Sequence, residues 1–187
     1  VAAYDNNPHI SEMMLTGGSP TMHGALVNEL THFANERNIF ITIETEGSHF
    51  LTTDYPINLL SISPKFKNSV PKLGALTPLG KITDEKMIKQ HNKLRLNTKA
   101  IKDSIEYHSD YHVKPVWNGS DMDALKEITD YIEELEVDHN KVYFMPSGGS
   151  REQLFESYPL VFDWIRDNGY RMTWRAHIMA FEDQREV

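Results

Sequence analysis

The chain has 187 residues, a hydrophobic content of 40% and a formal net charge of −8, which predicts a single domain over residues 1–187 with one buried core. The acidic balance argues against partners that require a basic surface, so we expect neither nucleic acid nor an anionic membrane to bind. No apolar run approaches the roughly 20 residues that span a bilayer, and no leader is visible, so we expect a cytoplasmic protein with a small-molecule ligand.

The sequence contains no cysteine. Neither a disulfide nor a thiolate site for zinc or an iron-sulfur cluster can therefore form from these residues alone. His108 and His112 have i,i+4 spacing, but they straddle a predicted helix end and strand start, so we predict no metal site in this chain. The first residue is Val1 rather than methionine, and a strand pattern begins soon after it. We therefore suspect that an N-terminal segment is missing.

The first half of the chain alternates short β-branched runs with helical patterns, which predicts βαβ units and a largely parallel sheet. Strands are predicted over residues 12–16, 39–45 and 58–63, and a helix over 24–37. Residues 68–83 contain proline and glycine, which predicts a loop that could form a mobile flap. A single long helix is predicted over residues 84–106.

The second half repeats this alternation. Strands are predicted over residues 111–116, 141–145 and 170–178, which brings the number of strands to six. A helix over 121–136 has Ser120 or Asp121 as its cap. A second helix should run to about residue 168, because Ser150 and Gln153 have the spacing of a capping box and Gly169 can close the last turn.

Polar and glycine-rich segments follow four of the predicted strands, and a fifth lies at the last one. Because the carboxyl ends of parallel strands open on one face of a sheet, this placement is typical of a single catalytic mouth. The segments are Thr16-Gly17-Gly18, Glu44-Thr45-Glu46-Gly47, Ser63-Pro64-Lys65, Met145-Pro146-Ser147-Gly148 and Arg175-Ala176-His177.

Each segment also has an ordinary structural interpretation. Gly17 and Gly18 fit a tight turn, or a turn that lets a ligand approach the backbone. Glu44 fits a solvated carboxylate or an acceptor for a ligand amine or hydroxyl, and Lys65 a surface lysine or a charge for a ligand carboxylate. His177 on an apolar strand fits a core histidine. The motifs of serine hydrolases, P-loop proteins and Rossmann folds are absent.

Taken in order, these segments resemble the 7-carboxy-7-deazaguanine synthases, a family of radical S-adenosylmethionine (SAM) enzymes. The resemblance covers nearly the whole chain. It implies an α/β fold, an incomplete radical SAM (β/α) barrel with a mainly parallel sheet, of which this chain would be the larger, C-terminal part. The matching residues are Leu15-Thr16-Gly17-Gly18-x-Pro20, Glu44-Thr45-x-Gly47, Ser63-Pro64-Lys65, Tyr143-Phe144-Met145-Pro146, Gly169-Tyr170-Arg171 and Arg175-x-His177.

The resemblance implies a carbon-nitrogen lyase type of reaction with three cofactors: SAM, a [4Fe-4S] cluster and Mg²⁺. A radical derived from SAM would take hydrogen from 6-carboxy-5,6,7,8-tetrahydropterin, and ring contraction with loss of ammonia would give 7-carboxy-7-deazaguanine, a precursor of queuosine. The cofactors supply this chemistry, and the protein orients them and excludes water. A missing first strand would leave an open sheet edge, which would favour a homodimer.

The resemblance also implies roles for individual residues, although it assigns no catalytic residue. The pterin would meet Thr16, His177 and the terminal carboxylate of Val187, because a carboxylate can accept two N–H bonds from a guanine-like edge. SAM would be bound by Gly18, Glu44, Ser63, Pro64, Lys65, Met145, Pro146, Ser147 and Gly148.

Three departures from the family pattern matter. The cysteine triad is absent, so we expect the chain as given to be inactive. Ser19 stands where the wider superfamily usually has a glutamate for the SAM amino group, and residues 181–187 are more acidic than the family ending. Two alternatives therefore stay open: another radical SAM activating enzyme, and a non-catalytic descendant of the fold that binds a ligand.

Overall fold

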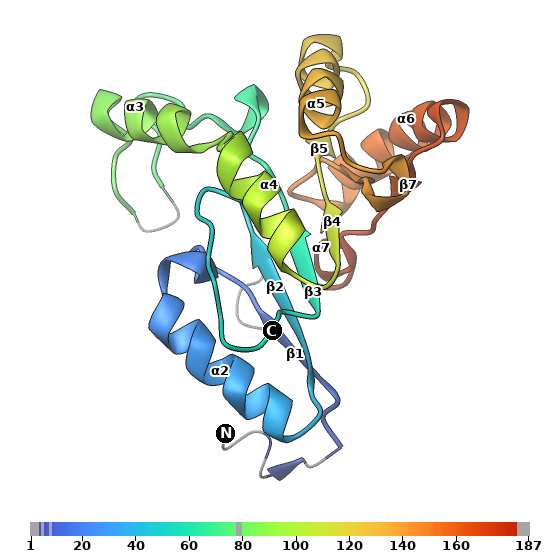
Figure 1. The fold of residues 1–187 in the computed structure, drawn as a ribbon. Helices are drawn as coiled ribbons and strands as arrows, with labels where there is room; N and C mark the ends of the chain where they lie inside the picture. Colours follow the sequence, from blue (N-terminus) through green and yellow to red (C-terminus); the bar gives the residue numbers. More distant parts are fainter. Residues whose placement is uncertain (1–3, 5, 8, 78–79, 183–187) are drawn as a thin grey trace. The chain divides into compact units, whose positions relative to one another are not determined.

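The computed structural model describes residues 4, 6–7, 9–77 and 80–182 (Figure 1). The described residues group into two compact units, the first within Val1–Ile62 and Asn97–His112 and the second within Ser63–Leu96 and Val113–Val187. Whether the chain behaves as one domain stays a prediction. None of the helices in these described ranges is long and apolar enough to cross a bilayer.

The first unit is built on a sheet with the strand order β1 (Glu12–Leu15), β2 (Phe40–Thr45), β3 (Leu59–Ile62) and β4 (Tyr111–Val113). β1 pairs with β2, and β2 with β3, in parallel. Three successive residues in the middle of β2 are buried, as is typical of a parallel strand covered on both faces. The predicted parallel pairing is confirmed here, and the ends of β1, β2 and β3 differ from the prediction by at most one residue.

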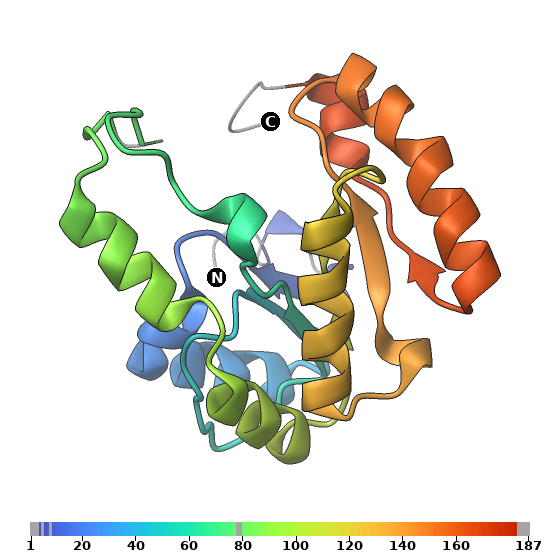
Figure 2. The same cartoon turned by 90° about the horizontal axis from the view of Figure 1, so that it is seen from above.

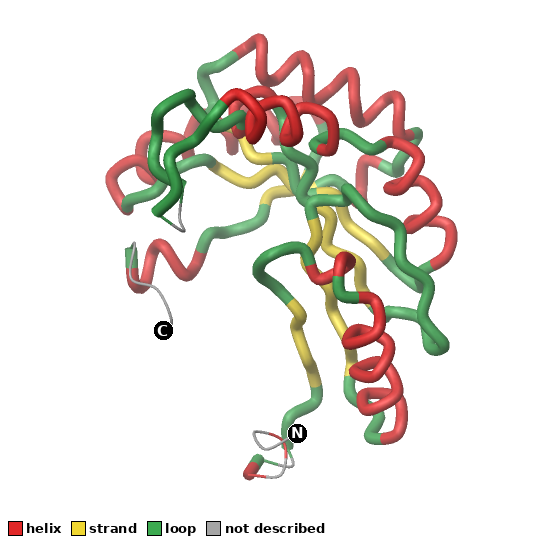
Figure 3. The backbone as a smooth tube through the Cα atoms, turned by 90° about the vertical axis from the view of Figure 1, so that its left-hand side faces the viewer, coloured by secondary structure: helices red, strands yellow, loops and turns green. Residues whose placement is uncertain are grey.

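Two helices cover the strands of this unit. α2 (Gly24–Glu36) packs along β2, and α4 (Thr98–Tyr107) packs against β3 (Figure 3). α2 begins after the short 3-10 turn η1 (Pro20–Met22). The buried residues of α2 are Val27, Thr31 and Ala34, and those of α4 are Ala100, Ile101 and Ser104.

The prediction of one helix over residues 84–106 is wrong. The segment forms two helices, α3 (Glu85–Leu94) in the second unit and α4 in the first. Asn97 starts the new helix, because its side chain accepts a hydrogen bond from the Ala100 amide at 3.2 Å and donates one to the Ser48 carbonyl at 2.9 Å. A short amide side chain that bonds to the backbone favours a helix cap over a helix interior.

The second unit has a three-stranded sheet in the order β5 (Val116–Trp117), β6 (Tyr143–Pro146) and β7 (Arg171–Met172), with parallel pairing throughout. The predicted single strand over 111–116 is therefore wrong, since β4 ends at residue 113 and β5 begins at 116. Pro115 lies in the gap, and it cannot donate to a strand ladder because it has no N–H group.

Helices and an aromatic cluster complete this unit. α6 (Arg151–Asn168) lies along β6 (Figure 2), and α5 (Met122–Leu135) packs on the 3-10 turn η2 (Lys67–Ser69). A second 3-10 turn, η3 (His139–Lys141), precedes β6. Four aromatic rings pack on one another between β5, β6 and α6, with centroid distances from 5.1 to 6.5 Å: those of Trp117, Phe144, Trp164 and Tyr170.

The predicted ends of α5 and α6 are confirmed. Asp121 is the cap of α5, since its carboxylate accepts a hydrogen bond from the amide three residues on. Ser150 caps α6 by accepting from the Gln153 amide at 3.3 Å, and Gly169 closes the helix with a φ of 73°. The Gln153 side chain reaches back to the Gly149 amide at 2.8 Å, one residue earlier than a capping box requires.

The predicted last strand over 170–178 is wrong beyond its first residues. The chain leaves the sheet after β7 and forms α7 (Ala176–Phe181), which carries His177. Two features favour this helix: it contains two alanines and a methionine, which are good helix formers, and Arg151 caps its C-terminus. The Arg151 guanidinium donates to the carbonyls of Met179 and Ala180, each at 2.9 Å.

Candidate functional site

A turn with unusual backbone angles follows β1 in the first unit. Gly17, Gly18 and Ser19 have φ values of 81°, 60° and 95°, so all three lie in the left-handed region that favours glycine. A Cβ atom added to either glycine would meet nothing within 4 Å. Glycine is therefore required at these positions by the backbone angles, not by steric crowding. The space that a Cβ atom would occupy is open to a ligand.

Thr16 and Glu44 lie side by side at the ends of two neighbouring strands. Leu15 of β1 pairs with Ile43 of β2, so the next residue of each strand comes into reach of the other. The Thr16 hydroxyl donates a hydrogen bond to Glu44 Oε2 at 2.9 Å. The structure thus brings together one residue predicted to face the pterin and one predicted to bind SAM.

Glu46 is a half-buried carboxylate that the sequence interpretation passed over. Its Oε1 atom accepts hydrogen bonds from the hydroxyls of Ser19, at 2.7 Å, and of Ser48. The Ser48 hydroxyl also contacts Nδ1 of His49 at 2.7 Å. Burial raises the pKa of Glu46, but the hydrogen bonds from Ser48 and Ser19, a backbone hydrogen bond and the nearby His49 together outweigh burial, so the pKa lies below its ordinary value. An ionised carboxylate therefore supports the turn where Ser19 has its strained φ.

Replacing Glu46 with glutamine should lower the free energy of unfolding at neutral pH by about 1 kcal/mol, because the amide keeps an acceptor oxygen but loses the charge that strengthens the hydrogen bonds. Because the folded pKa lies below the unfolded one, the carboxylate stabilises the fold above the ordinary value of 4.5, and this contribution is lost as the pH falls through the folded pKa. Urea unfolding at several pH values measures both effects. The exposed Glu29→Gln is the control for loss of charge, and an unchanged acid dependence in Glu46→Gln would contradict this role.

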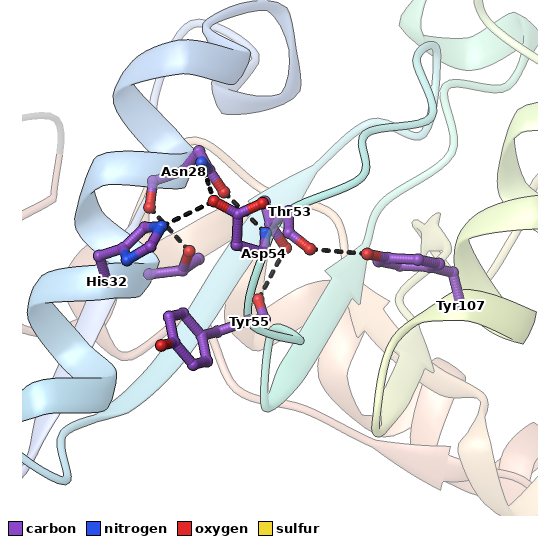
Figure 4. A network of polar contacts seen from close by, with 7 residues as sticks. Asn28, His32, Thr53, Asp54, Tyr55 and Tyr107 are labelled. Atoms are coloured by element: carbon purple, nitrogen blue, oxygen red, sulfur yellow. Dashed lines mark hydrogen bonds and ion pairs between the residues drawn. The ribbon is translucent and has the colours of Figure 1, made fainter.

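A separate polar network ties α2 to the loop that precedes β3 (Figure 4). Asp54 accepts hydrogen bonds from Asn28 at 2.9 Å and from Nε2 of His32 at 2.7 Å, and these two contacts lower its pKa. The neighbouring Thr53 carbonyl accepts a hydrogen bond from the Tyr107 hydroxyl at 2.7 Å. None of the predicted site residues takes part in these contacts, so we interpret the network as support for the loop.

The second unit contains a cavity of about 380 Å³ among the predicted SAM-binding residues. It brings together the turn after β3 and the loops after β5 and β6, which are distant in sequence. The cavity is lined by Pro64, Lys65, Phe66, Asn68, Ser69, Val116, Asn118, Asp121 and Ser147.

A second cavity of about 310 Å³ shares Asn118 and Ser147 with the first. Gly148 lines this second cavity, whereas Met145 and Pro146 lie in β6 and line neither of the two. Asn118 had not been predicted from the sequence. Asn118 directly follows the observed strand β5 and comes two residues after the strand predicted over 111–116, so a polar side chain near a strand end was the signal that could have identified it. The second cavity is lined by Asn118, Ser120, Ser147, Gly148, Gln153, Glu156, Ser157 and Leu160.

The Ser63-Pro64-Lys65 segment makes hydrogen bonds to the backbone of Lys114 and Arg95. The Ser63 hydroxyl donates to the Lys114 carbonyl at 3.1 Å, so it is engaged with the protein itself. Pro64 is buried and Lys65 is half-buried. The Lys65 amide donates to the Arg95 carbonyl at 3.4 Å.

The predicted residues near the C-terminus are placed differently. His177 is exposed on α7, so its interpretation as a core histidine is wrong. Val187 lies outside the described residues. Arg175 connects this region to the loop after β6, since its guanidinium donates to the Gly148 carbonyl at 2.8 Å. Burial lowers the pKa of Arg175, although contact with Tyr158 opposes that effect.

The residues of this chain fit SAM better than they fit a cluster. The cavity in the second unit, with a lysine and several hydroxyl or amide groups, suits a polar ligand of that kind. In the first unit, the glycine turn leaves its backbone open to a ligand. A [4Fe-4S] cluster needs thiolates, and the sequence has none. Among the described residues, no group of three or more histidine, aspartate or glutamate side chains is arranged to hold a metal ion.

Two curated proteins are similar to nearly the whole chain. The 7-carboxy-7-deazaguanine synthase of Rhodopirellula baltica is 29% identical over 176 residues, covering 94% of this chain and 63% of the relative. The synthase of the same name from Halobacterium salinarum is 26% identical over 190 residues, covering 100% of this chain and 71% of the relative. No family model matches the sequence. The predicted resemblance to these synthases is confirmed, and the chain spans less than two thirds of the Rhodopirellula protein.

Solved structures show the same fold at low identity. The structure of Streptococcus suis SuiB bound to S-adenosylmethionine matches with a TM-score of 0.52 and 14% identity, covering 87% of this chain and 37% of SuiB. A second SuiB structure matches with a TM-score of 0.50 and 14% identity, over 87% of this chain and 38% of that one. The predicted α/β fold with mainly parallel strands is confirmed, and the described strands form a four-stranded and a three-stranded sheet.

Proposed function

We propose that this chain forms the SAM-binding and pterin-binding part of a 7-carboxy-7-deazaguanine synthase. The observation that carries the proposal is the similarity to two proteins of that name along nearly the whole chain. It is supported by the position of the predicted residues in each unit: Thr16 and Glu44 are hydrogen-bonded at the strand ends of the first, and Lys65 and Ser147 line one cavity in the second.

In this proposal the chain binds and orients two small molecules. Bound SAM would supply the radical chemistry. The Lys65 ammonium would attract the SAM carboxylate, and the backbone at Ser147 and Gly148 would offer polar groups to the rest of the cofactor. In the first unit, Glu44 and the Gly18 backbone are the residues that the resemblance assigns to SAM. Thr16 would face 6-carboxy-5,6,7,8-tetrahydropterin, with its hydroxyl oriented by Glu44, and His177 would also meet the pterin.

The residues of this chain do not fit a [4Fe-4S] cluster, which is bound by thiolates. The 187 residues contain no cysteine, so no step is assigned to a cluster held by this chain, and we place its ligands outside this sequence. Magnesium has no ligands assigned to it either. The second candidate function is a non-catalytic module of the same fold that binds SAM without a cluster. The absence of cysteine from the sequence favours it.

The test is reconstitution of the full-length reading frame under anaerobic conditions. The protein is incubated with SAM, a reductant and 6-carboxy-5,6,7,8-tetrahydropterin, and 7-carboxy-7-deazaguanine is detected by mass spectrometry. We expect product with loss of ammonia. Cluster binding without product would contradict this substrate, and SAM binding without a cluster would favour the non-catalytic module.

A further inference from the structure

A partly buried ion pair in the second unit holds the backbone on both sides of Phe66. Arg95, at the end of α3, donates from Nη1 to Glu127 Oε1 of α5 at 2.8 Å and to the Lys65 carbonyl at 3.3 Å. The other carboxylate oxygen, Oε2 of Glu127, accepts from the Lys67 amide at 2.8 Å. The Lys65 amide in turn donates to the Arg95 carbonyl. One ion pair thus makes hydrogen bonds to the backbone of Lys65 and Lys67.

The burial of this pair makes it a poor source of stability. The side chains of Arg95 and Glu127 are only 14% and 16% exposed, and the partial desolvation of the two charges offsets much of their attraction. Moreover, Arg95 Nε is buried without a hydrogen-bond partner, which is a further cost. The pair instead fixes the position of the backbone at Lys65 and Lys67, because charge-assisted hydrogen bonds are short and directional.

The backbone segment that this ion pair holds forms part of the wall of the first cavity. Pro64, Lys65 and Phe66 all line the cavity of about 380 Å³. Phe66 is 2% exposed and packs edge-on against Tyr131 of α5 at 5.9 Å, so the turn is anchored from its apolar side as well. Because the backbone is hydrogen-bonded on both sides of Phe66, the backbone position from which the Lys65 side chain extends is fixed.

We propose that Arg95 and Glu127 are positioning residues for SAM: they hold the turn from Lys65 to Lys67 so that the Lys65 ammonium meets the SAM carboxylate. The inference rests on the proposed function, since it takes SAM as the ligand of this cavity. Neither residue needs to contact SAM. They order the turn before SAM binds, so less conformational entropy is lost on binding. Preorganisation of this kind increases affinity.

The experiment uses the intact full-length protein and measures three quantities: SAM affinity by calorimetry, amide exchange at Lys65 and Lys67 without ligand, and the urea midpoint. The main variant is Arg95→Met combined with Glu127→Leu, because apolar replacement of a buried ion pair is often neutral for stability. Glu127→Gln is the second variant if the double variant does not fold. Asp130→Asn is the matched control, since it breaks an exposed ion pair with Lys126 on the same helix.

We expect the double variant to bind SAM about tenfold more weakly and to exchange the two amides about tenfold faster, the effect of one charge-assisted hydrogen bond. Its urea midpoint should stay near that of the wild type, and the control should change none of the three quantities. Arg95→Lys, which keeps the charge, should restore part of the affinity. Unchanged exchange, or unchanged affinity with faster exchange, would overturn the inference. A wild-type protein that binds no SAM would overturn the proposed function before any substitution is made.

Discussion

Replacing Gly47 with alanine should lower the free energy of unfolding by about 3 kcal/mol. Its φ of 81° costs an L-residue about 1 kcal/mol. The added Cβ would also lie 2.6 Å from Ile101 Cγ1 and 3.1 Å from Ile62 Cγ2. Both isoleucines are 0% exposed, so neither can move into solvent, and overpacking of this kind adds roughly 2 kcal/mol. Urea denaturation followed by circular dichroism measures the loss.

Gly17 provides a matched control for this prediction. It has the same φ of 81°, but a Cβ there would meet nothing within 4 Å. Gly17→Ala should therefore cost only the backbone term, about 1 kcal/mol. Equal losses in the two variants would show that Ile101 relaxes without penalty, and would contradict the packing argument.

Replacing Trp117 with alanine should lower the free energy of unfolding by about 4 kcal/mol, as is usual for a large aromatic side chain in a core. Trp117 is 1% exposed and packs on Phe144 and Trp164. Its Nε1 atom also donates to the carbonyl of Asp121, the cap of α5, at 2.7 Å. Thermal unfolding followed by circular dichroism measures the effect.

Two variants bracket the Trp117 result. Trp117→Phe keeps a ring but removes the N–H donor, so it should cost about 1–2 kcal/mol. Phe155→Ala removes an aromatic side chain that is 65% exposed on α6, and its cost should stay within about 0.5 kcal/mol. If all three variants lost the same stability, the aromatic cluster would not be the core of the second unit.

The parts of the fold that could be predicted from sequence are those with local causes. The side chain of Ser150 sets the start of α6, and the backbone freedom of Gly169 sets its end. Both effects act within one helical turn. The strand β2 follows from its β-branched residues. Because strand ends in a parallel fold converge, the same local signals also located Lys65 and Ser147, which the structure places at one cavity.

Contacts between residues that are far apart in the sequence could not be predicted. Arg95 and Glu127 are 32 positions apart, and no local pattern pairs them. The replacement of the last predicted strand by α7 depends on Arg151, which caps it from the start of another helix. The break between α3 and α4 depends partly on the Ser48 carbonyl, which Asn97 reaches from 49 positions away. In the last two cases a tertiary contact overrides the local propensity.

The division of the chain into two units has a spectroscopic consequence. All three tryptophans, at positions 117, 164 and 174, belong to the second unit. Tryptophan fluorescence therefore reports on that unit alone, whereas far-ultraviolet circular dichroism reports on the helices of both. Unfolding curves from the two signals should coincide if the chain unfolds as one cooperative domain, and should separate if the units unfold independently. A substitution in the first unit, such as Gly47→Ala, would then change the fluorescence midpoint only through cooperativity between the units.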